Sequence, residues 1–301
     1  MHHHLSWLEA SVIGALQGVA ELFPVSSLGH SVLLPAVIGG SWARDLNVSA
    51  PESPYLAFIV GLHVATAIAL LIYFWRDWVR IIRGLVTSIS RREVQTSDQR
   101  LAWLLILATI PVGLVGLLAE HWFRTTLAKP NPTAAFLVVN GFILLFAERL
   151  RRRDPNLDST YVDERITGPE SDERLAKQPV AQAVLIGTTQ ILALAPGISR
   201  SGIAMVGGML RGLSREDAAR FSFLLATPVI LAAGALKLGD LFGPLGSGIR
   251  GQVLLGSLLS GIGAYISVRF LTRYLANRSL RPFGAYCIAA GVASLVVFAA
   301  R

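Results

Sequence analysis

Polar and ionisable side chains are concentrated in two short segments of an otherwise apolar chain. The first segment contains Glu21 and His30, with Ser26 and Ser27 between them. Gln17 precedes Glu21 by four residues, so the two side chains share a face if this stretch is helical. A carboxylate, an imidazole and neighbouring hydroxyl groups are the side chains that proton transfer and nucleophilic attack use.

The second segment contains Arg200 between Ser199 and Ser201, with Gly197 and Gly202 on either side. A glycine-rich turn that leads into a helix N-terminus presents backbone N–H groups to an anion, and the planar fork of an arginine suits phosphate oxygens. Both segments together fit phosphoryl transfer, with a serine or water as the attacking group. One carboxylate with polar oxygens could also hold Mg²⁺ or Ca²⁺, the phosphate completing the shell.

Each ionisable residue also has a plainer explanation when it is taken alone. A buried histidine is usually bonded to a carbonyl group, a buried glutamate can be protonated, and a buried arginine can cap a helix C-terminus. An Arg or Asp at the centre of a membrane helix costs about 2.5–3.5 kcal/mol on insertion scales. Because Glu21, His30 and Arg200 occur together beside four serines, the functional explanation is favoured.

The composition indicates an integral membrane protein. Of 301 residues, 53% are hydrophobic and 15% are charged, and the mean hydropathy is +0.56. A soluble domain carries roughly 25% charged residues, so a soluble enzyme, a disordered protein and a disulfide scaffold are excluded. Cys287 is the single cysteine. The net charge of +8 does not indicate a nucleic-acid partner, because the cations form short clusters between apolar segments.

Six segments are long and apolar enough to cross a hydrocarbon core, which takes roughly 20 residues per helix. Two more apolar stretches, 5–38 and 181–210, have the polar segments in their middle, and each is predicted to be a re-entrant hairpin of two half-helices. Irregular backbone at membrane depth is tolerated where protein buries it or a wet cavity adjoins it. The predicted spans are 55–75, 101–120, 133–150, 218–238, 251–271 and 283–300.

The distribution of Lys and Arg predicts the orientation. The loops 76–100, 149–180, 211–220 and 272–282 hold 19 of them, and the loops and C-terminus on the other side hold 6. The positive-inside rule makes the first set cytoplasmic and places both termini outside. The two hairpins then enter from opposite sides, so we expect their tips to meet near the midplane.

The two polar segments also resemble each other, and each is followed by three spans. We therefore expect an all-α membrane protein in which an inverted-topology repeat relates two halves. The whole chain, 1–301, is predicted to be a single membrane domain. Repeat one covers about 5–150, repeat two about 181–300, and a cytoplasmic linker about 151–180 joins them.

At these residues the sequence resembles a known family. Residues 17–30, QGVAELFPVSSLGH, are similar to the first signature of the undecaprenyl-pyrophosphate phosphatases, also called bacitracin-resistance proteins. Residues 196–202, PGISRSG, are similar to the second signature. The resemblance extends over nearly the whole chain, because residues 74–76, 207–210 and 221–225 also fit.

The resemblance implies hydrolysis of undecaprenyl pyrophosphate to the monophosphate and inorganic phosphate, which recycles the carrier lipid of peptidoglycan synthesis and gives bacitracin resistance. It also implies a multi-pass protein of the cytoplasmic membrane, with the site open to the outer face. A polyprenyl pyrophosphate and membrane lipids are the expected partners, and a divalent cation, Mg²⁺ or Ca²⁺, the expected cofactor. The family residues that carry over by motif position are Gln17, Glu21, Ser26, Ser27, His30 and Arg200.

The expected roles follow from that match. Ser27 is the preferred nucleophile, His30 the general base and acid, and Arg200 the phosphate ligand, while attack by water with Ser27 only binding phosphate stays open. Glu21 handles a metal or a proton, with Gln17 as the second metal ligand. The expected phosphate-binding residues are Ser26, Ser199, Arg200, Ser201 and Gly202.

The sequence departs from the commonest family pattern at two positions. Gln17 stands where many members have Glu, and Leu28 where Thr or Ser is frequent, so paired carboxylates are excluded and one hydroxyl is missing. His63, in the first long span, could face the same cavity, but a structural role is favoured for it.

The principal alternative function is a flippase or secondary transporter for a lipid phosphate, because broken helices and inverted repeats are typical of transporters. A purely structural membrane protein is the least favoured alternative, because it does not explain why Glu21 and Arg200 are placed in apolar segments. The prenyl chain length, the metal, the nucleophile and the oligomeric state, including a homodimer, stay open.

Overall fold

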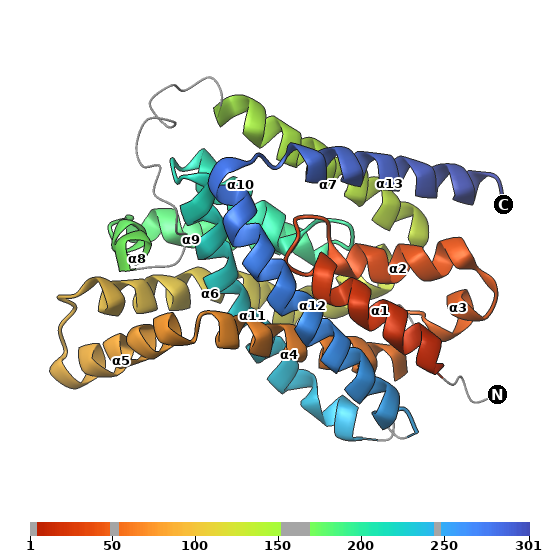
Figure 1. Ribbon diagram of the computed structural model, residues 1–301, viewed down its shortest axis with the longest axis horizontal. Coiled ribbons are helices and arrows are strands. Elements are labelled where there is room, and N and C mark those ends of the chain that lie inside the picture. The colour runs from red at the N-terminus through yellow and green to blue at the C-terminus, as the bar shows by residue number, and fades with distance from the viewer. Residues whose placement is uncertain (1–4, 49–53, 152–168, 244–247) are drawn as a thin grey trace.

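The computed structural model describes residues 5–48, 54–151, 169–243 and 248–301, and these form helices joined by short turns (Figure 1). The helices of the first half are α1 (Trp7–Ala20), α2 (Ser27–Ile38), α3 (Gly40–Asp45), α4 (Pro54–Tyr73), α5 (Trp75–Arg91), α6 (Ser97–Trp122), η1 (Phe123–Leu127) and α7 (Pro130–Arg151). Those that follow are α8 (Pro169–Ala176), α9 (Val180–Thr189), η3 (Gln190–Leu194), α10 (Arg200–Leu210), α11 (Arg215–Phe242), α12 (Arg250–Asn277) and α13 (Arg281–Ala299).

Six helices among the described residues are long and apolar enough to cross a membrane, which confirms the predicted number of spans. Each begins and ends within a few residues of its predicted range, except that the fifth extends six residues further at its C-terminal end. The spans are Tyr55–Tyr73, Ser97–Ala119, Pro130–Leu150, Arg215–Leu236, Arg250–Asn277 and Arg281–Ala299. The chain is therefore an all-α, multi-pass membrane protein.

Two pairs of shorter helices contain the polar segments. In the first pair, α1 and α2 are joined by a turn in which Ser26 has a φ of +68°. In the second pair, α9 continues into the 3₁₀ turn η3 and is joined to α10 through Gly197, whose φ is +107°. The predicted interruption of both segments is confirmed, whereas their re-entrant path through a membrane stays a prediction.

Ion pairs hold the basic loops together at one end of the molecule. The guanidinium group of Arg80 on α5 lies 3.0 Å from Asp98 at the start of α6 and 2.6 Å from Asp172 on α8. Arg220 on α11, which is fully buried, donates to Asp172 at 2.9 Å and lies 3.2 Å from Asp77. Burial raises the pKa of the Asp172 carboxyl, and the Arg220 and Arg80 guanidinium groups counteract this.

A second ion pair brings further helix ends to the same place. Glu148 near the end of α7 accepts from Arg215 at the start of α11 at 2.8 Å and from the backbone N–H of Leu280, just before α13, at 3.0 Å. The described parts of the loops predicted to be cytoplasmic thus meet at one end, and residues 152–168 of the predicted linker lie outside the described residues. At the opposite end one apolar cluster contains Leu46, Val48, Ala128 and Ile249.

Small residues allow the broken helices to approach the spans closely. A Cβ atom at Gly14 of α1 would lie 2.5 Å from the carbonyl oxygen of Gly256 on α12, and one at Gly187 of α9 would clash with the carbonyl oxygen of Ala108 on α6. Such contacts between small residues are typical of helix packing in membranes. α7 packs along α13, and α4 packs against α11. These pairings are what two inverted repeats would produce, and the repeat itself stays a prediction.

Three α-helices and the π-helix η1 among the described residues were not predicted from the sequence. α3 and α8 are short, and α5 is an amphipathic helix of 17 residues between the first two spans. α5 crosses the start of α6, where Gly84 lies against the backbone of Asp98 and Gln99. α5 therefore packs against the beginning of the second span.

A polar site between the two broken helix pairs

The two polar segments lie against each other, although the residues in contact are separated by 171 and 179 positions along the chain. Arg200, the first residue of α10, donates through Nη2 to Oε1 of Glu21 at 2.6 Å. The backbone N–H of Gly197 donates to Oγ of Ser26 at 3.1 Å. These contacts confirm that the two breaks meet, whereas their position near the midplane of a membrane stays a prediction.

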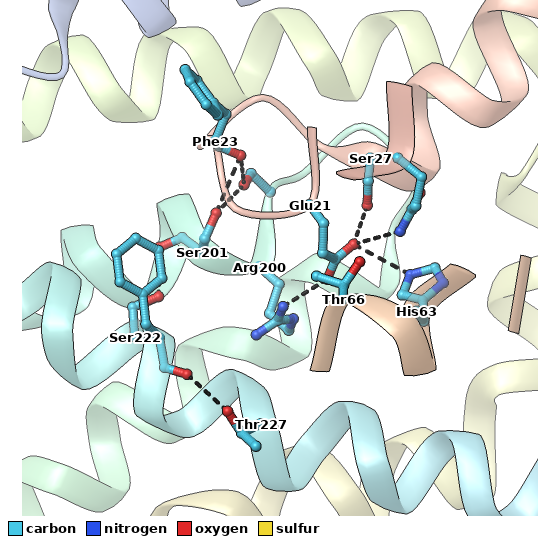
Figure 2. Close-up of polar contacts among 12 residues, drawn as sticks. Glu21, Phe23, Ser27, His63, Thr66, Arg200, Ser201, Ser222 and Thr227 are labelled. Atoms are coloured by element: carbon cyan, nitrogen blue, oxygen red, sulfur yellow. Dashed lines mark hydrogen bonds and ion pairs between the residues drawn. The ribbon is translucent and has the colours of Figure 1, made fainter. Parts of the chain in front are cut away.

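The carboxylate of Glu21 is the centre of the site (Figure 2). Its Oε2 atom accepts from Oγ of Ser27 at 2.5 Å and from Nε2 of Gln17 at 2.9 Å, and Nε2 of His63 lies 3.3 Å from it. Figure 2 shows Ser27, His63 and Arg200 approaching Glu21 from different sides. A buried carboxylate needs paired charge and hydrogen bonds to remain ionised, and these neighbours supply both.

Two polar atoms around the carboxylate are buried without a hydrogen-bond partner among the described residues. They are Nη1 of Arg200 and Oε1 of Gln17. Gln17 itself is 1% exposed. Buried polar groups are normally satisfied, so one guanidinium donor and one amide oxygen are left for a bound group.

The remaining serines of the site have protein partners. Oγ of Ser201 donates to the carbonyl oxygen of Phe23 at 3.2 Å, and Oγ of Ser199 accepts from the backbone N–H of Gly202 at 3.1 Å. Oγ of Ser26 accepts from two backbone N–H groups, those of Gly29 at 3.2 Å and of Gly197. These contacts hold the two turns together, and phosphate binding by the three serines stays a prediction.

Asn140 on α7 was not predicted as part of the site, and it links both turns. Its side chain donates to the carbonyl oxygen of Pro24 at 3.0 Å and accepts from the backbone N–H of Ser199 at 3.0 Å. The side chain is buried. The sequence does contain an indication of this role, because Asn140 lies in the middle of a predicted span. Burying a polar side chain in a membrane costs free energy, so such residues usually have a function.

The imidazole of His30 points toward α13. Its Nδ1 atom lies 2.8 Å from the carbonyl oxygen of Ser26, so this nitrogen carries the proton, and Nε2 accepts from the hydroxyl of Tyr286 at 2.7 Å. The two rings are stacked, with centroids 5.7 Å apart. The hydroxyl of Ser27 donates to Glu21 instead, so the contacts pair Ser27 with a carboxylate rather than with the expected histidine.

His63 on α4 occupies the position that the sequence analysis considered structural. Its Nδ1 atom lies 2.8 Å from the carbonyl oxygen of Ile59, and Nε2 faces Glu21. Both ring nitrogens face acceptor oxygens, which is the arrangement of an imidazolium. His63 and Arg200 together surround a single carboxylate, and the excess positive charge suits an anion.

The residues of the site can contribute oxygen ligands to a hard cation. Glu21 and the orphaned Oε1 of Gln17 are the two donors. The part of the chain that the structure describes has no group of three or more His, Cys, Asp or Glu side chains that could hold a metal. A cation here would therefore need phosphate oxygens and water, which is how Mg²⁺ is commonly held.

Fold and site together define a multi-pass membrane protein with a charged centre between two broken helix pairs. The model of the bacitracin resistance protein BacA family matches residues 10–293, so the chain belongs to that family. It is 63% identical over the full length of both chains to the undecaprenyl-diphosphatase of Mycolicibacterium paratuberculosis. It is 50% identical to undecaprenyl-diphosphatase 1 of Frankia casuarinae, covering 97% of this chain and 98% of that one, and 41% identical to the undecaprenyl-diphosphatase of Granulibacter bethesdensis, covering 96% and 95%.

Proposed function

We infer that the chain hydrolyses undecaprenyl diphosphate to undecaprenyl phosphate and inorganic phosphate. The relatives named undecaprenyl-diphosphatase match along the whole chain, and their names favour hydrolysis over transport. The observation that carries the inference is the contact of Arg200 with Glu21, because it joins the two motifs into one charged centre. A membrane phosphatase of this kind recycles a carrier lipid for peptidoglycan synthesis.

The geometry supports Ser27 as the nucleophile. Its hydroxyl already donates to Glu21 at 2.5 Å, and a nucleophile in hydrogen-bond reach of a base is the arrangement that covalent catalysis requires. As Oγ of Ser27 attacks the terminal phosphorus, Glu21 takes the hydroxyl proton, and the bond to the bridging oxygen breaks so that undecaprenyl phosphate leaves with that oxygen. Water then attacks the phosphorus of the phosphoserine, Glu21 returns its proton to the departing Oγ, and inorganic phosphate leaves with both hydrogens of the water.

Arg200 and His63 supply the positive charge. Nη2 of Arg200 holds Glu21, and its buried Nη1 is left to donate to a phosphate oxygen. Phosphoryl transfer depends mainly on positioning and on stabilising negative charge on the phosphate oxygens. Donors fixed before the substrate arrives need no reorganisation at the moment of reaction.

The experiment measures phosphate release from undecaprenyl diphosphate by purified protein in detergent. We expect Ser27→Ala, Glu21→Gln and Arg200→Ala each to lower turnover at least a hundredfold, because each removes a group from the reacting centre. A phosphoserine at position 27, trapped by rapid quench, would separate attack by Ser27 from attack by water. Near-normal turnover in all three folded variants would contradict the proposed site.

Gln17 and Glu21 would hold a divalent cation, which would neutralise charge on the pyrophosphate when bound. Gln17→Glu adds a carboxylate beside Glu21, so we expect tighter binding of Mn²⁺, a paramagnetic substitute for Mg²⁺, measured as relaxation enhancement of water protons. Gln17→Leu removes the amide oxygen and should weaken that binding. Equal Mn²⁺ affinity of both variants and the unaltered protein would show that no cation binds here.

The cytoplasmic membrane is the proposed location, with the site reached from the side opposite the basic loops. Support comes from the ion pairs among Arg80, Asp172 and Arg220, which hold the basic end together. Labelling of cysteines introduced at 47 and 95 with a membrane-impermeant maleimide in intact cells tests the orientation. We expect labelling at 47 and protection at 95.

A further inference from the structure

α5 carries an apolar stripe that no other described element covers. Its members are more than a third exposed, from 37% to 58%, and are spaced alternately by four and three residues, so they lie on one face. The stripe consists of Trp75, Val79, Ile82, Val86 and Ile89. The opposite face packs inward through Ile81, Gly84 and Ser88. Five large apolar side chains exposed on one face of a helix indicate a site that contacts another protein or a membrane.

Basic side chains border this stripe. Arg76 and Arg83 are exposed beside it, and the guanidinium group of Arg76 lies 5.3 Å from the centre of the Trp75 ring. The single acid of the helix, Asp77, is turned inward, where it bonds to Arg80 at 2.6 Å. The outward face is therefore apolar in its middle and cationic at its edge.

The position of α5 decides which partner fits. α5 follows the span α4 after one intervening residue, Phe74, and its inner face crosses the first turns of α6, where Thr87 accepts from Gln99 at 3.1 Å. The ends of two spans place α5 at the boundary between hydrocarbon and water. Helices with an apolar face and a basic edge lie in that boundary, and exposed Lys or Arg bind anionic headgroups there.

We propose that α5 is an interfacial helix that embeds the stripe in the membrane surface and binds anionic lipid headgroups through Arg76 and Arg83. Each basic side chain near such a surface is worth about a fivefold gain in affinity. A soluble protein or a second copy of this chain could also cover an apolar stripe. The bilayer is favoured for two reasons. α5 adjoins the ends of α4 and α6, so a bilayer crossed by these two spans lies next to it, and anionic headgroups complement the charge of the arginines.

The depth of α5 can be measured with a nitroxide label in full-length protein reconstituted into vesicles containing phosphatidylglycerol. The native Cys287 is buried, so labels introduced by Ile82→Cys and, as a water-exposed control, Gln95→Cys react selectively. We expect the label at 82 to collide mainly with oxygen, which partitions into lipid, and the label at 95 mainly with a water-soluble nickel chelate. Collision of both labels with the chelate to the same extent would overturn the proposal.

The arginines are tested with Arg76→Gln and Arg83→Gln together. We expect this pair to lower the oxygen-to-nickel ratio at 82 at least twofold in anionic vesicles and to have no effect in neutral ones. The matched control, Arg269→Gln with Arg273→Gln, removes the same charge from exposed positions of α12 and should leave the ratio unchanged. A label at 82 protected from both reagents would show a protein partner or a second copy on the stripe and would also overturn the proposal.

Discussion

At the scale of single residues, the structure differs most from the prediction at His63, for which the sequence favoured a structural role. It faces Glu21 at 3.3 Å and shares that carboxylate with Arg200. Removing it leaves Arg200 as the sole positive partner. We expect His63→Ala to lower kcat about tenfold, the effect of one lost charge-assisted hydrogen bond, in the same phosphate-release assay.

His63→Gln separates charge from hydrogen bonding, because the amide can donate to Glu21 without carrying charge. Partial recovery of kcat with Gln would assign the role to the hydrogen bond, and none would assign it to the charge. Turnover of His63→Ala equal to that of the unaltered protein would refute a role for this residue.

Tyr286 is a second residue-scale prediction. Its hydroxyl donates to Nε2 of His30, while the carbonyl oxygen of Ser26 holds the proton on Nδ1. Tyr286→Phe keeps the stacked ring and removes the donor. On the prediction from the sequence that His30 is a general base and acid, we expect kcat to fall about tenfold with KM unchanged. The ¹⁵N shift of Nε2 in the His30 ring should change as well, because the hydrogen bond to this nitrogen is lost.

Tyr73→Phe is the matched control for this prediction, because it removes a tyrosine hydroxyl bonded at 2.9 Å to Thr272, between α4 and α12. It should leave kcat and the His30 shifts unaltered. An unchanged kcat in Tyr286→Phe, with unchanged shifts, would show that His30 does not depend on Tyr286.

The site could be predicted from the sequence only in part. Glu21 and Arg200 are opposite charges in apolar surroundings, and their contact follows from the cost of burying either alone. The directions of His30 and His63 could not be predicted, because they depend on rotamers set by Ser26 and Ile59. Tyr286 lies in an apolar span, and only the packing of α13 near α2 brings it to the site.

At the scale of elements, the fit of α9 against α6 depends on the absence of a side chain at Gly187. Gly187→Ala would push the second broken pair away from its span, so we expect the free energy of unfolding to fall by about 1–3 kcal/mol. Turnover should fall as well, because α9 leads to the turn that carries Arg200. Chemical unfolding in detergent measures the first effect.

Gly113→Ala is the control, since nothing lies within 4 Å of a Cβ atom built at that position of α6. Alanine has the higher helix propensity by up to about 1 kcal/mol, so this variant should be as stable as the unaltered protein or more so. Equal stability of the two variants would show that the close approach at Gly187 does not matter.

The spans were predictable because each is a local run of apolar residues, and the breaks because proline, glycine and serine interrupt such runs. α5 was missed because its apolar residues alternate with arginines and form no continuous run. Its pattern becomes visible when helical spacing is applied to the loop between the first two spans.

At the scale of the whole molecule, the buried ions at the basic end hold the helix ends together. Asp172 is fully buried and accepts from Arg220 and Arg80. Asp172→Asn leaves Arg220 buried with less negative charge, so we expect a loss of about 3 kcal/mol in the free energy of unfolding. Glu170→Gln, exposed on the same helix, should change it by less than about 0.5 kcal/mol.

Thermal unfolding of both variants in the same detergent checks this prediction. An apparent Tm of Asp172→Asn equal to that of Glu170→Gln would mean that the ion pairs contribute nothing to the fold. The orientation, the inverted repeat and a homodimer stay predictions, because helix contacts within one chain specify neither a surrounding membrane nor a second copy.

The partners Glu21 and Arg200 are separated by 179 positions along the chain. A ribosome adds about 5–20 residues per second, so the carboxylate is made roughly ten to forty seconds before its guanidinium exists. During that interval His63 on α4 is the positive partner that the nascent first half offers to Glu21. Completion of the charged centre is therefore an event of biosynthesis, and a chain truncated before Arg200 would leave the carboxylate with the imidazole of His63 but without its guanidinium partner.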